Sequence, residues 1–285
     1  MAVTGWDGGK KPVILKSMRV FPSTLLAIVI LFVSCAGAPY DAVFSSGKGP
    51  GFTSIQEIQL DSFRVLRGGH PDGKWMALVF TKEENRLKIS SPKRLPLESQ
   101  HAPSFFQDEN VFGVMSASPH DPIRFFAHQE QNVSGFFRTN GETHSMPDGR
   151  HDALGLDGDG MIHLLSPEHQ KEWTEDAVGG FYALLVQGVP QQPVSVRDAL
   201  CAIGWNDHEV FLFVAEGRDG KGLSYEEGGA LLHTLGAMDA LAMDGGGSAR
   251  LMWREMGVLK SFPPRFAHRA LPNFLLMTHE PLSLP

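Results

Sequence analysis

The sequence predicts a fold that combines β-strands with helix and contains a strand–helix–strand unit in its last third. Residues 209–218 (EVFLFVAEGR) form a nearly continuous apolar run, which is typical of a buried strand. Ser224 and Glu227 have the spacing of a helix capping box, and Gly236 stands where that helix would stop. A second apolar strand follows at 238–244 (MDALAMD). This order predicts a βαβ unit, whose strands run parallel with a right-handed crossover.

Upstream of this unit, short apolar runs alternate with polar turn residues, which is the pattern of several strands. The repeated Asp-Gly pair at 157–160 is typical of a hairpin turn. The same four residues resemble the beginning of a calcium-binding loop, but the later ligands and the terminal glutamate of such a loop are missing. We expect strands within 74–80, 85–90, 111–117, 134–141 and 160–165.

Two acidic residues end the two strands of the predicted βαβ unit. Glu216 ends the first strand and Asp244 ends the second. Parallel strands place their carboxyl ends at one edge of a sheet, and ligands bind at that edge in open α/β folds. We therefore expect the two carboxylates to face one crevice.

A glycine-rich loop follows Asp244 directly, in the sequence DGGGS. Successive glycines allow backbone N–H groups to approach an anion closely. The alternative is a tight turn into the next strand, with the Asp244 carboxylate accepting hydrogen bonds from its own loop. The local pattern leaves both interpretations open. The candidate anion-binding residues are Gly245, Gly246, Gly247 and Ser248.

The N-terminal segment has the features of a secretory signal peptide. Lys16 and Arg19 precede an apolar stretch at 25–33, and small residues follow it. This stretch is shorter than the roughly 20 residues that a membrane-spanning helix needs. The residues FVSC, which end at Cys35, resemble a bacterial lipoprotein cleavage box, so Cys35 is the predicted site of lipid attachment. Cleavage after Ala36, without a lipid, is the alternative.

The chain therefore divides into three predicted parts. Residues 1–35 are a signal peptide, with Met18 as an alternative start. Residues 36–62 are rich in Gly, Ser and Pro, which is typical of a flexible tether. Residues 63–285 form a single domain. This organisation predicts an exported protein that a lipid anchor attaches to a membrane, on its periplasmic or extracellular side.

The charge balance argues against a nucleic-acid partner. Without residues 1–34 the chain has 21 basic and 31 acidic side chains, a net charge of −10, whereas nucleic-acid binding requires a basic face. Cys201 lies in an apolar run, which favours a buried structural thiol. None of the 12 histidines has the spacing of a zinc site. The sequence requires no cofactor, and no ligand cluster supports a divalent metal.

Several segments, taken together, resemble the phosphodiester glycosidase family. The hallmark of this family is a strand that ends in Asp-Gly-Gly-Gly-Ser, after a strand that ends in Asp-Gly-Arg and a helix that begins with Thr/Ser-x-x-Glu. In this chain the Asp-Gly-Arg motif reads Glu216-Gly217-Arg218. The resemblance extends over about residues 64–277. The segments that carry it are AVGGFYALLVQG (177–188), AIGWNDHEVFLFVAEGR (202–218), the helix and glycine loop (222–251) and HRALPNF (268–274).

The resemblance implies an α+β domain built around a mixed β-sheet with flanking helices. It also implies hydrolysis of the bond between the anomeric carbon of a sugar and a phosphodiester, with a glycan or sugar phosphate as the substrate. Asp244 and Glu216 would share the acid and base roles that such hydrolysis needs. Arg218 would help the glycine loop to hold the phosphate. The resemblance also implies that Arg269, Asn273, Gly179 and Gly180, which match the family, belong to the substrate- or phosphate-binding residues.

Besides Glu216, three positions depart from the family pattern. Ser116 stands in place of a strand-end asparagine, and His120 in place of a phenylalanine. Leu200 replaces an arginine, for which Arg197 is a candidate substitute. Because two polar family groups are missing, at Ser116 and Leu200, a second hypothesis stays open. It is a non-catalytic surface lipoprotein that keeps the fold and binds a glycan or phosphoglycan.

Overall fold

The computed structural model describes residues 53–90, 96–191, 194–264 and 269–279. These residues belong to the compact unit Ala42–Pro285. The predicted signal peptide, Met18, Cys35 and most of the predicted tether lie outside the described residues. Among the residues described, no helix combines the length and apolar character that crossing a membrane would need.

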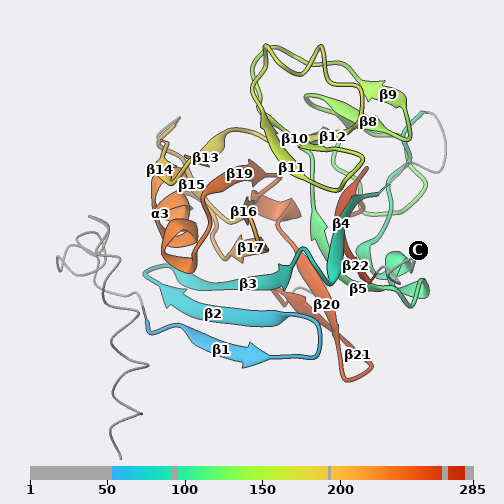
Figure 1. Cartoon of the computed structure of the whole chain (residues 1–285). Helices are drawn as coiled ribbons and strands as arrows, with labels where there is room; N and C mark the ends of the chain where they lie inside the picture. The colour runs from blue at the N-terminus through green and yellow to red at the C-terminus, as the bar shows by residue number, and fades with distance from the viewer. Residues whose placement is uncertain (1–52, 91–95, 192–193, 265–268, 280–285) are drawn as a thin grey trace, which may run out of the picture. The chain divides into compact units, whose positions relative to one another are not determined.

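The largest element is a sheet of eight strands, which we call the main sheet (Figure 1). Every neighbouring pair in it is antiparallel. The edge strand β1 lies inside the predicted tether. Most of its side chains are exposed, so the sequence has no apolar pattern there that predicts a strand. The strands in spatial order are β1 (Gln56–Gln59), β2 (Arg64–His70), β3 (Gly73–Thr81), β17 (Glu209–Ala215), β16 (Leu200–Trp205), β19 (Asp239–Met243), β13 (Ala183–Val186) and β14 (Val189–Pro190).

Two five-stranded antiparallel sheets and two short strand pairs complete the β-structure of the described residues. One sheet has the order β21 (Val258–Phe262), β20 (Leu251–Glu255), β5 (Val111–Ser116), β22 (Phe274–His279) and β4 (Asn85–Ile89). The other has the order β11 (Ile162–Leu165), β10 (Ala153–Leu156), β12 (Asp176–Gly179), β8 (Phe137–Thr139) and β9 (Glu142–Ser145). The short pairs are β6 (His120–Asp121) with β7 (Asn132–Val133), and β15 (Arg197–Asp198) with β18 (Leu223–Ser224).

Helix is a minor part of the fold, so the predicted α+β class with a mixed sheet and flanking helices is wrong. Strand accounts for 49% of the described residues and helix for 9%. Among the described residues, α3 (Tyr225–Leu235) is the one α-helix, beside the short 3₁₀ turns η1 (Ala102–Gln107) and η2 (Gly246–Ser248). The strong helical signal around Ser224 is genuine, but it belongs to a single helix in a β-rich chain.

The elements of the predicted βαβ unit occur in the expected order, but its two strands are not adjacent in the sheet. The elements β17, α3 and β19 follow one another, and both strands run antiparallel to β16. The strands β17 and β19 therefore point the same way, yet β16 lies between them. Local periodicity identifies each element, whereas the pairing with β16 depends on a segment earlier in the chain.

The central strands of the main sheet are buried on both faces, and this explains their continuous apolar runs. In β17, Val210, Leu212 and Val214 face a core shared with the β5 and β22 sheet. The alternate residues Phe211 and Phe213 face a second core shared with α3. Because side chains alternate between the faces of a strand, a run without polar residues means that both faces are covered.

The capping box predicts the start of α3 correctly. The Ser224 hydroxyl accepts a hydrogen bond from the Glu227 amide at 3.2 Å, and the Glu227 carboxylate accepts one from the Ser224 amide at 2.9 Å. The helix ends at Gly236, whose φ of 112° suits a glycine in the left-handed region. The N-terminus of α3 is thereby held at the end of β18, beside the cavity described below.

The cap gives a direct test of this helix start. The substitution Ser224→Ala removes the acceptor for the Glu227 amide, and we expect it to lower the free energy of unfolding by about 1 kcal/mol. Urea unfolding measures this change. Ser54→Ala, at an exposed position outside any helix, is the matched control. Equal stability of the two variants would contradict a structural role for the cap.

Candidate functional site

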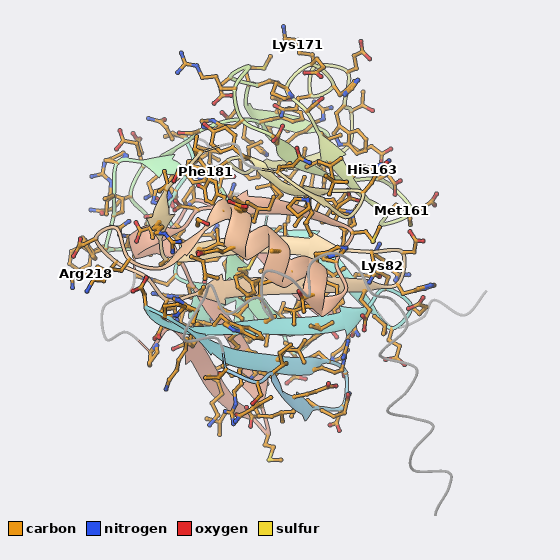
Figure 2. All side chains as sticks on the ribbon, turned by 90° about the vertical axis from the view of Figure 1, so that its left-hand side faces the viewer. Lys82, Met161, His163, Lys171, Phe181 and Arg218 are labelled. Carbon is orange, nitrogen blue, oxygen red and sulfur yellow. The ribbon has the colours of Figure 1, made fainter. Side chains whose placement is uncertain are left out.

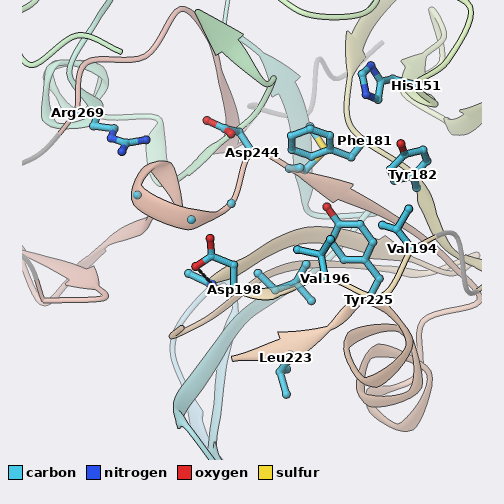
Figure 3. A pocket seen from close by; sticks show the side chains of 16 residues that line it. His151, Phe181, Tyr182, Val194, Val196, Asp198, Leu223, Tyr225, Asp244 and Arg269 are labelled. Carbon is cyan, nitrogen blue, oxygen red and sulfur yellow. Dashed lines mark hydrogen bonds between the residues drawn. The ribbon is translucent and has the colours of Figure 1, made fainter. Parts of the chain in front are cut away.

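A cavity of about 630 Å³, which we call the main cavity, opens where β19 ends and α3 begins. Its volume lies within the usual range of small-molecule sites. In the view of Figure 3, Asp244 lies between Arg269 and Phe181, with Asp198 and Tyr225 below it. The lining residues are His151, Phe181, Tyr182, Val194, Val196, Asp198, Ala199, Leu200, Leu223, Tyr225, Met243, Asp244, Gly245, Gly246, Gly247 and Arg269.

Asp244 follows β19 and presents its carboxylate to the main cavity. Its backbone amide donates to the Ala117 carbonyl at 2.8 Å. Its Oδ2 lies 3.1 Å from Nδ1 of His120, whose side chain is 2% exposed. The same nitrogen lies 3.4 Å from the Ser118 carbonyl oxygen, so Nδ1 carries the proton in this arrangement. Asp244 Oδ2 is thus buried against His120 at ion-pair distance but without hydrogen-bond geometry, while the Asp244 side chain still lines the cavity.

Asp198 is a second acid of the main cavity, and the sequence did not identify it. It ends β15 and is separated from β16 by Ala199 alone, and its Oδ1 accepts a hydrogen bond from the Ala199 amide at 2.7 Å. Because β16 runs antiparallel to β19, the start of β16 lies beside the end of β19. The sequence signal that could have identified Asp198 is an acidic residue just before the buried strand β16. This signal points to the site only if β16 is known to run antiparallel to β19.

Some backbone amides of the glycine loop already donate hydrogen bonds to carbonyl groups of the protein. The Gly246 amide donates to the Ala199 carbonyl at 2.8 Å, and the Ser248 amide donates to the Gly245 carbonyl at 3.0 Å. The positive φ of 52° at Gly246 favours glycine there. A side chain at Gly247 would overlap the Arg269 guanidinium. The loop therefore provides close approach for Arg269, and two of its amides are already used within the protein.

Arg269 brings the positive charge to the main cavity. Its Nη1 donates to the Ser248 hydroxyl at 3.2 Å, and its side chain lines the cavity beside Gly247. An arginine presents paired donors that suit a phosphate. The structure thus places the glycine loop and Arg269 together at the main cavity.

Arg218 lies outside the main cavity. Its Nε is 3.0 Å from Oδ2 of Asp219, and its side chain is 88% exposed. Figure 2 shows it projecting outward at the edge of the molecule. It borders a neighbouring cavity of about 520 Å³, which shares Asp198, Gly246, Gly247 and Arg269 with the main cavity.

An aromatic wall forms the side of the main cavity opposite Arg269 in Figure 3. The rings of Tyr182 and Tyr225 are 6.2 Å apart between centroids, and Phe181 contacts the ring of His151 edge to face. Burial raises the pKa of Tyr225 to about 12, and Tyr182 and the two aspartates add to this effect. The Tyr225 hydroxyl therefore stays protonated and can donate a hydrogen bond. His151 is held by Asp148, with 2.6 Å between Nδ1 and Oδ2.

Glu216 does not join Asp244. Its backbone amide donates to the Lys74 carbonyl and its Oε2 accepts from the Lys74 amide, at 2.8 Å and 2.9 Å. These bonds align Glu216 with β3, on the side of β17 away from β16 and β19. It lines a separate cavity of about 620 Å³, which we call the second cavity. The expected crevice with both carboxylates is absent because β16 separates the two strands.

Ser116 and Asn273 act inside the protein. Both are fully buried. The Ser116 hydroxyl accepts from the Arg250 amide at 3.2 Å and lies 3.5 Å from the Asp244 carbonyl oxygen. The Asn273 side chain accepts from the Ser118 amide at 2.9 Å and donates to the Ser118 hydroxyl at 3.0 Å. These bonds hold the segment that carries His120 against the end of β19.

The other positions of the family pattern, apart from Leu200, lie around the main cavity rather than in it. Arg197 donates to the Gly222 carbonyl and pairs with Glu227 at 2.5 Å, so it does not take the place of an arginine at Leu200. Leu200 is part of the cavity wall and is 3% exposed. A Cβ at Gly180 would lie 2.5 Å from the Ala242 carbonyl oxygen, and one at Gly179 would lie 3.1 Å from the Phe136 backbone. These glycines allow close packing.

Two further observations concern cysteine and metal. Cys201 is buried, as predicted, and burial raises the pKa of its thiol to about 12. The thiol lies 3.3 Å from the Ser116 hydroxyl, so it packs inside the protein and does not reach the main cavity. Within the described ranges, no group of three or more His, Cys, Asp or Glu side chains is arranged to hold a metal ion.

Comparison with known proteins gives one family and several similar folds. The family model described as phosphodiester glycosidase matches residues 122–278. No curated protein matches the chain. A hypothetical protein from Synechocystis has a TM-score of 0.60 at 13% identity, over 80% of this chain and 64% of its own. The chain thus spans slightly less than two thirds of that protein.

A second solved structure is similar over most of both chains. It is the catalytic domain of zebrafish N-acetylglucosamine-1-phosphodiester α-N-acetylglucosaminidase, auto-inhibited by its pro-peptide. Its TM-score is 0.51 at 17% identity, and the match covers 82% of this chain and 85% of that one. At this identity the likeness concerns the fold.

The buried Asn273 gives a test of how the site is supported. We expect Asn273→Ala to lower the free energy of unfolding by about 1–3 kcal/mol, because the Ser118 amide loses its buried acceptor. Urea unfolding measures the loss. Asn132→Ala removes the same side chain at an exposed position and should stay within about 0.5 kcal/mol of the parent protein. If both variants are equally stable, the proposed support of the His120 segment is wrong.

Proposed function

Because the chain belongs to the phosphodiester glycosidase family, which its match to the family model over 122–278 shows, we propose that it hydrolyses a sugar-1-phosphodiester. The reaction would break the bond between the anomeric carbon of the sugar and the phosphodiester. One observation carries the proposal: Asp244 and Asp198 line a single open cavity together with Arg269. Hydrolysis at an anomeric carbon uses two carboxyl groups, and a phosphate leaving group needs a cation.

The cavity favours one orientation of the substrate. Arg269 lies beside the glycine loop, which supports binding of the phosphate there. The aromatic wall of Phe181, Tyr182 and Tyr225 suits the apolar face of a sugar ring, and the Tyr225 hydroxyl can donate to a sugar oxygen. The anomeric carbon would then lie near Asp244, which Figure 3 shows between these two sides.

The two aspartates would divide the chemistry. One carboxylic acid protonates the departing phosphate oxygen, while the other carboxylate activates water or stabilises the positive charge that develops on the sugar. His120 Nδ1 lies 3.1 Å from Asp244 Oδ2, which supports a positioning role for His120. Arg269 would stabilise the charge on the released phosphate monoester.

Leu200, in place of the family arginine, does not fill the main cavity. Leu200 forms part of the wall, and a cavity of about 630 Å³ with two carboxylates remains in front of it. This observation favours hydrolysis over the alternative of a non-catalytic glycan-binding protein. The name of the zebrafish relative makes N-acetylglucosamine-1-phosphodiesters the first substrates to examine.

The test is hydrolysis of methyl phosphodiesters of N-acetylglucosamine, glucose and galactose 1-phosphate by purified residues 36–285. We expect Asp244→Asn and Asp198→Asn each to lower kcat/KM by about 100-fold or more, because each removes a group that transfers a proton or stabilises charge. Release of the sugar and of methyl phosphate measures the rate.

Asp61→Asn is the matched control, since Asp61 is exposed and lies outside both cavities. It should retain the parent rate. Unchanged rates in both Asp244→Asn and Asp198→Asn would rule out this assignment of the site. Binding of the sugar phosphates without any turnover would favour the glycan-binding alternative.

We also propose, from the N-terminal sequence, that the chain is exported and attached to a membrane through a lipid on Cys35. In a bacterial host, Cys35→Ser should move the protein from the membrane fraction to the soluble exported fraction, because the lipid is lost. Fractionation with an antibody measures this. Retention of Cys35→Ser in the membrane would contradict the lipid anchor.

A further inference from the structure

An exposed apolar loop joins β6 to β7 and takes no part in the proposed hydrolysis. We call residues 122–131, which connect the two strands, the apolar loop. Its side chains Ile123, Phe125 and Phe126 are 49%, 55% and 73% exposed. They line neither the main cavity nor the second cavity. Single exposed apolar residues are ordinary, whereas three within four consecutive residues form a patch that marks an interaction site.

Hydrogen bonds to the surrounding protein hold the apolar loop in this conformation. The Ser99 hydroxyl donates to the Phe126 carbonyl at 2.9 Å, and the His128 amide donates to the Ser99 carbonyl at 2.7 Å. The Gln131 side chain, which is buried, donates to the Pro122 carbonyl at 3.0 Å. The loop is therefore fixed at its start, its middle and its end, while its aromatic side chains remain on the outside.

The apolar loop adjoins the Arg269 side of the main cavity. The Ala270 amide donates to the Arg124 carbonyl at 3.0 Å, so the loop is bonded to the residue after Arg269. The loop also continues directly from β6, whose His120 lies against Asp244. A surface that contacts the apolar loop is therefore brought close to the Arg269 side of the proposed site.

The exposed area of the patch is too small for a stable protein partner. Since a phenylalanine side chain covers about 150–250 Å², the three partly exposed side chains together offer about 300–400 Å². Each partner in a stable protein complex contributes about 800 Å². Insertion of a few apolar side chains into the outer part of a bilayer needs no such area. The apolar loop therefore fits a lipid surface better than it fits a protein.

The proposed anchor at Cys35 supplies such a lipid surface. Residues 36–52 join Cys35 to Thr53, the first described residue. This segment reaches at most about 60 Å when fully extended, and a compact domain of this size is about 45 Å across. The anchor therefore permits any face of the domain to touch the membrane, so an exposed apolar patch decides which face does.

We propose that the apolar loop docks on the lipid bilayer to which the chain is anchored, with Ile123, Phe125 and Phe126 inserted among the lipids. The driving force is the removal of apolar surface from water. Docking in this orientation turns the Arg269 side of the main cavity towards the membrane. The choice of a membrane rests on the proposed anchor, whereas the docking itself is independent of hydrolysis.

The test holds the protein on a vesicle and measures which face touches the lipid. Residues 36–285 contain the whole compact unit Ala42–Pro285, and an N-terminal histidine tag on nickel-chelating lipid takes the place of the Cys35 anchor. The remaining lipid is neutral phosphatidylcholine. An environment-sensitive nitrobenzoxadiazole dye on Phe126→Cys reports insertion. The other cysteine of this protein, Cys201, is buried and does not react with the dye.

We expect the dye at position 126 to become severalfold brighter on the vesicles, with emission at shorter wavelength, because it leaves water. The chain without residues 1–34 has a net charge of −10, so no charge attraction contributes and the change should persist in about 0.5 M salt. Met256→Cys is the matched control. Met256 is 93% exposed and follows β20 at the end of its sheet away from Ser116. Its dye should keep its aqueous emission.

Two substitutions examine the side chains of the loop itself. Phe125→Ser and Ile123→Ser, each in the protein labelled at position 126, should lower the docking equilibrium constant about tenfold, because each removes an apolar group that enters the lipid. Val258→Ser is the matched control, since Val258 is a 56% exposed apolar residue of β21, and it should leave docking unchanged. Circular dichroism confirms that each variant is folded.

The proposal is overturned if the dye at position 126 keeps its aqueous emission on the vesicles, or if the dye at position 256 shows the larger change. It is also overturned if docking persists unchanged in both Phe125→Ser and Ile123→Ser. Self-association in solution that is lost in Phe125→Ser, measured by analytical ultracentrifugation, would assign the loop to a contact between copies of the chain and contradict membrane docking. Because the tag replaces the lipid, neither failure of the Cys35 prediction nor failure of the hydrolysis assay affects this result.

Discussion

The antiparallel insertion of β16 between β17 and β19 is the constraint on which the site depends. Ladder pairs join Cys201 to Met243 on one side and Leu200 to Ala215 on the other. This insertion places the start of β16 beside the end of β19. The Ala199 carbonyl can then accept the Gly246 amide at 2.8 Å, so the segment that carries Asp198 is bonded to the glycine loop.

The same pairing separates the two strand ends that the sequence suggested would meet. Asp244 gains Asp198 as its acidic neighbour in the main cavity, whereas Glu216 is aligned with Lys74 and contributes to the second cavity. A buried network around Ser116, Ser118 and Asn273 then fixes the approach of His120 to Asp244. Satisfied buried polar groups of this kind hold a loop in one arrangement, since an unpaired group would be costly.

Much of the local structure was predictable because its causes are local. The strands at 209–218 and 238–244, the cap at Ser224 and the helix stop at Gly236 follow from periodicity and capping chemistry. The buried state of Cys201 follows from its apolar surroundings. The predicted fold class was wrong because the sequence signal for one helix was taken to indicate several helices. The chain consists mainly of short strands, whose sequence patterns are weak.

By itself the sequence determined the elements around the site, the loop DGGGS and the family, because these depend on neighbouring residues and on motif order. Only the tertiary structure decided which strands are adjacent, which acid accompanies Asp244 and where Glu216 and Arg218 lie. The physical reason is that strand pairing joins segments far apart in the chain. Because β16 runs antiparallel to its two neighbours, its first residues lie at the edge of the sheet where β19 ends.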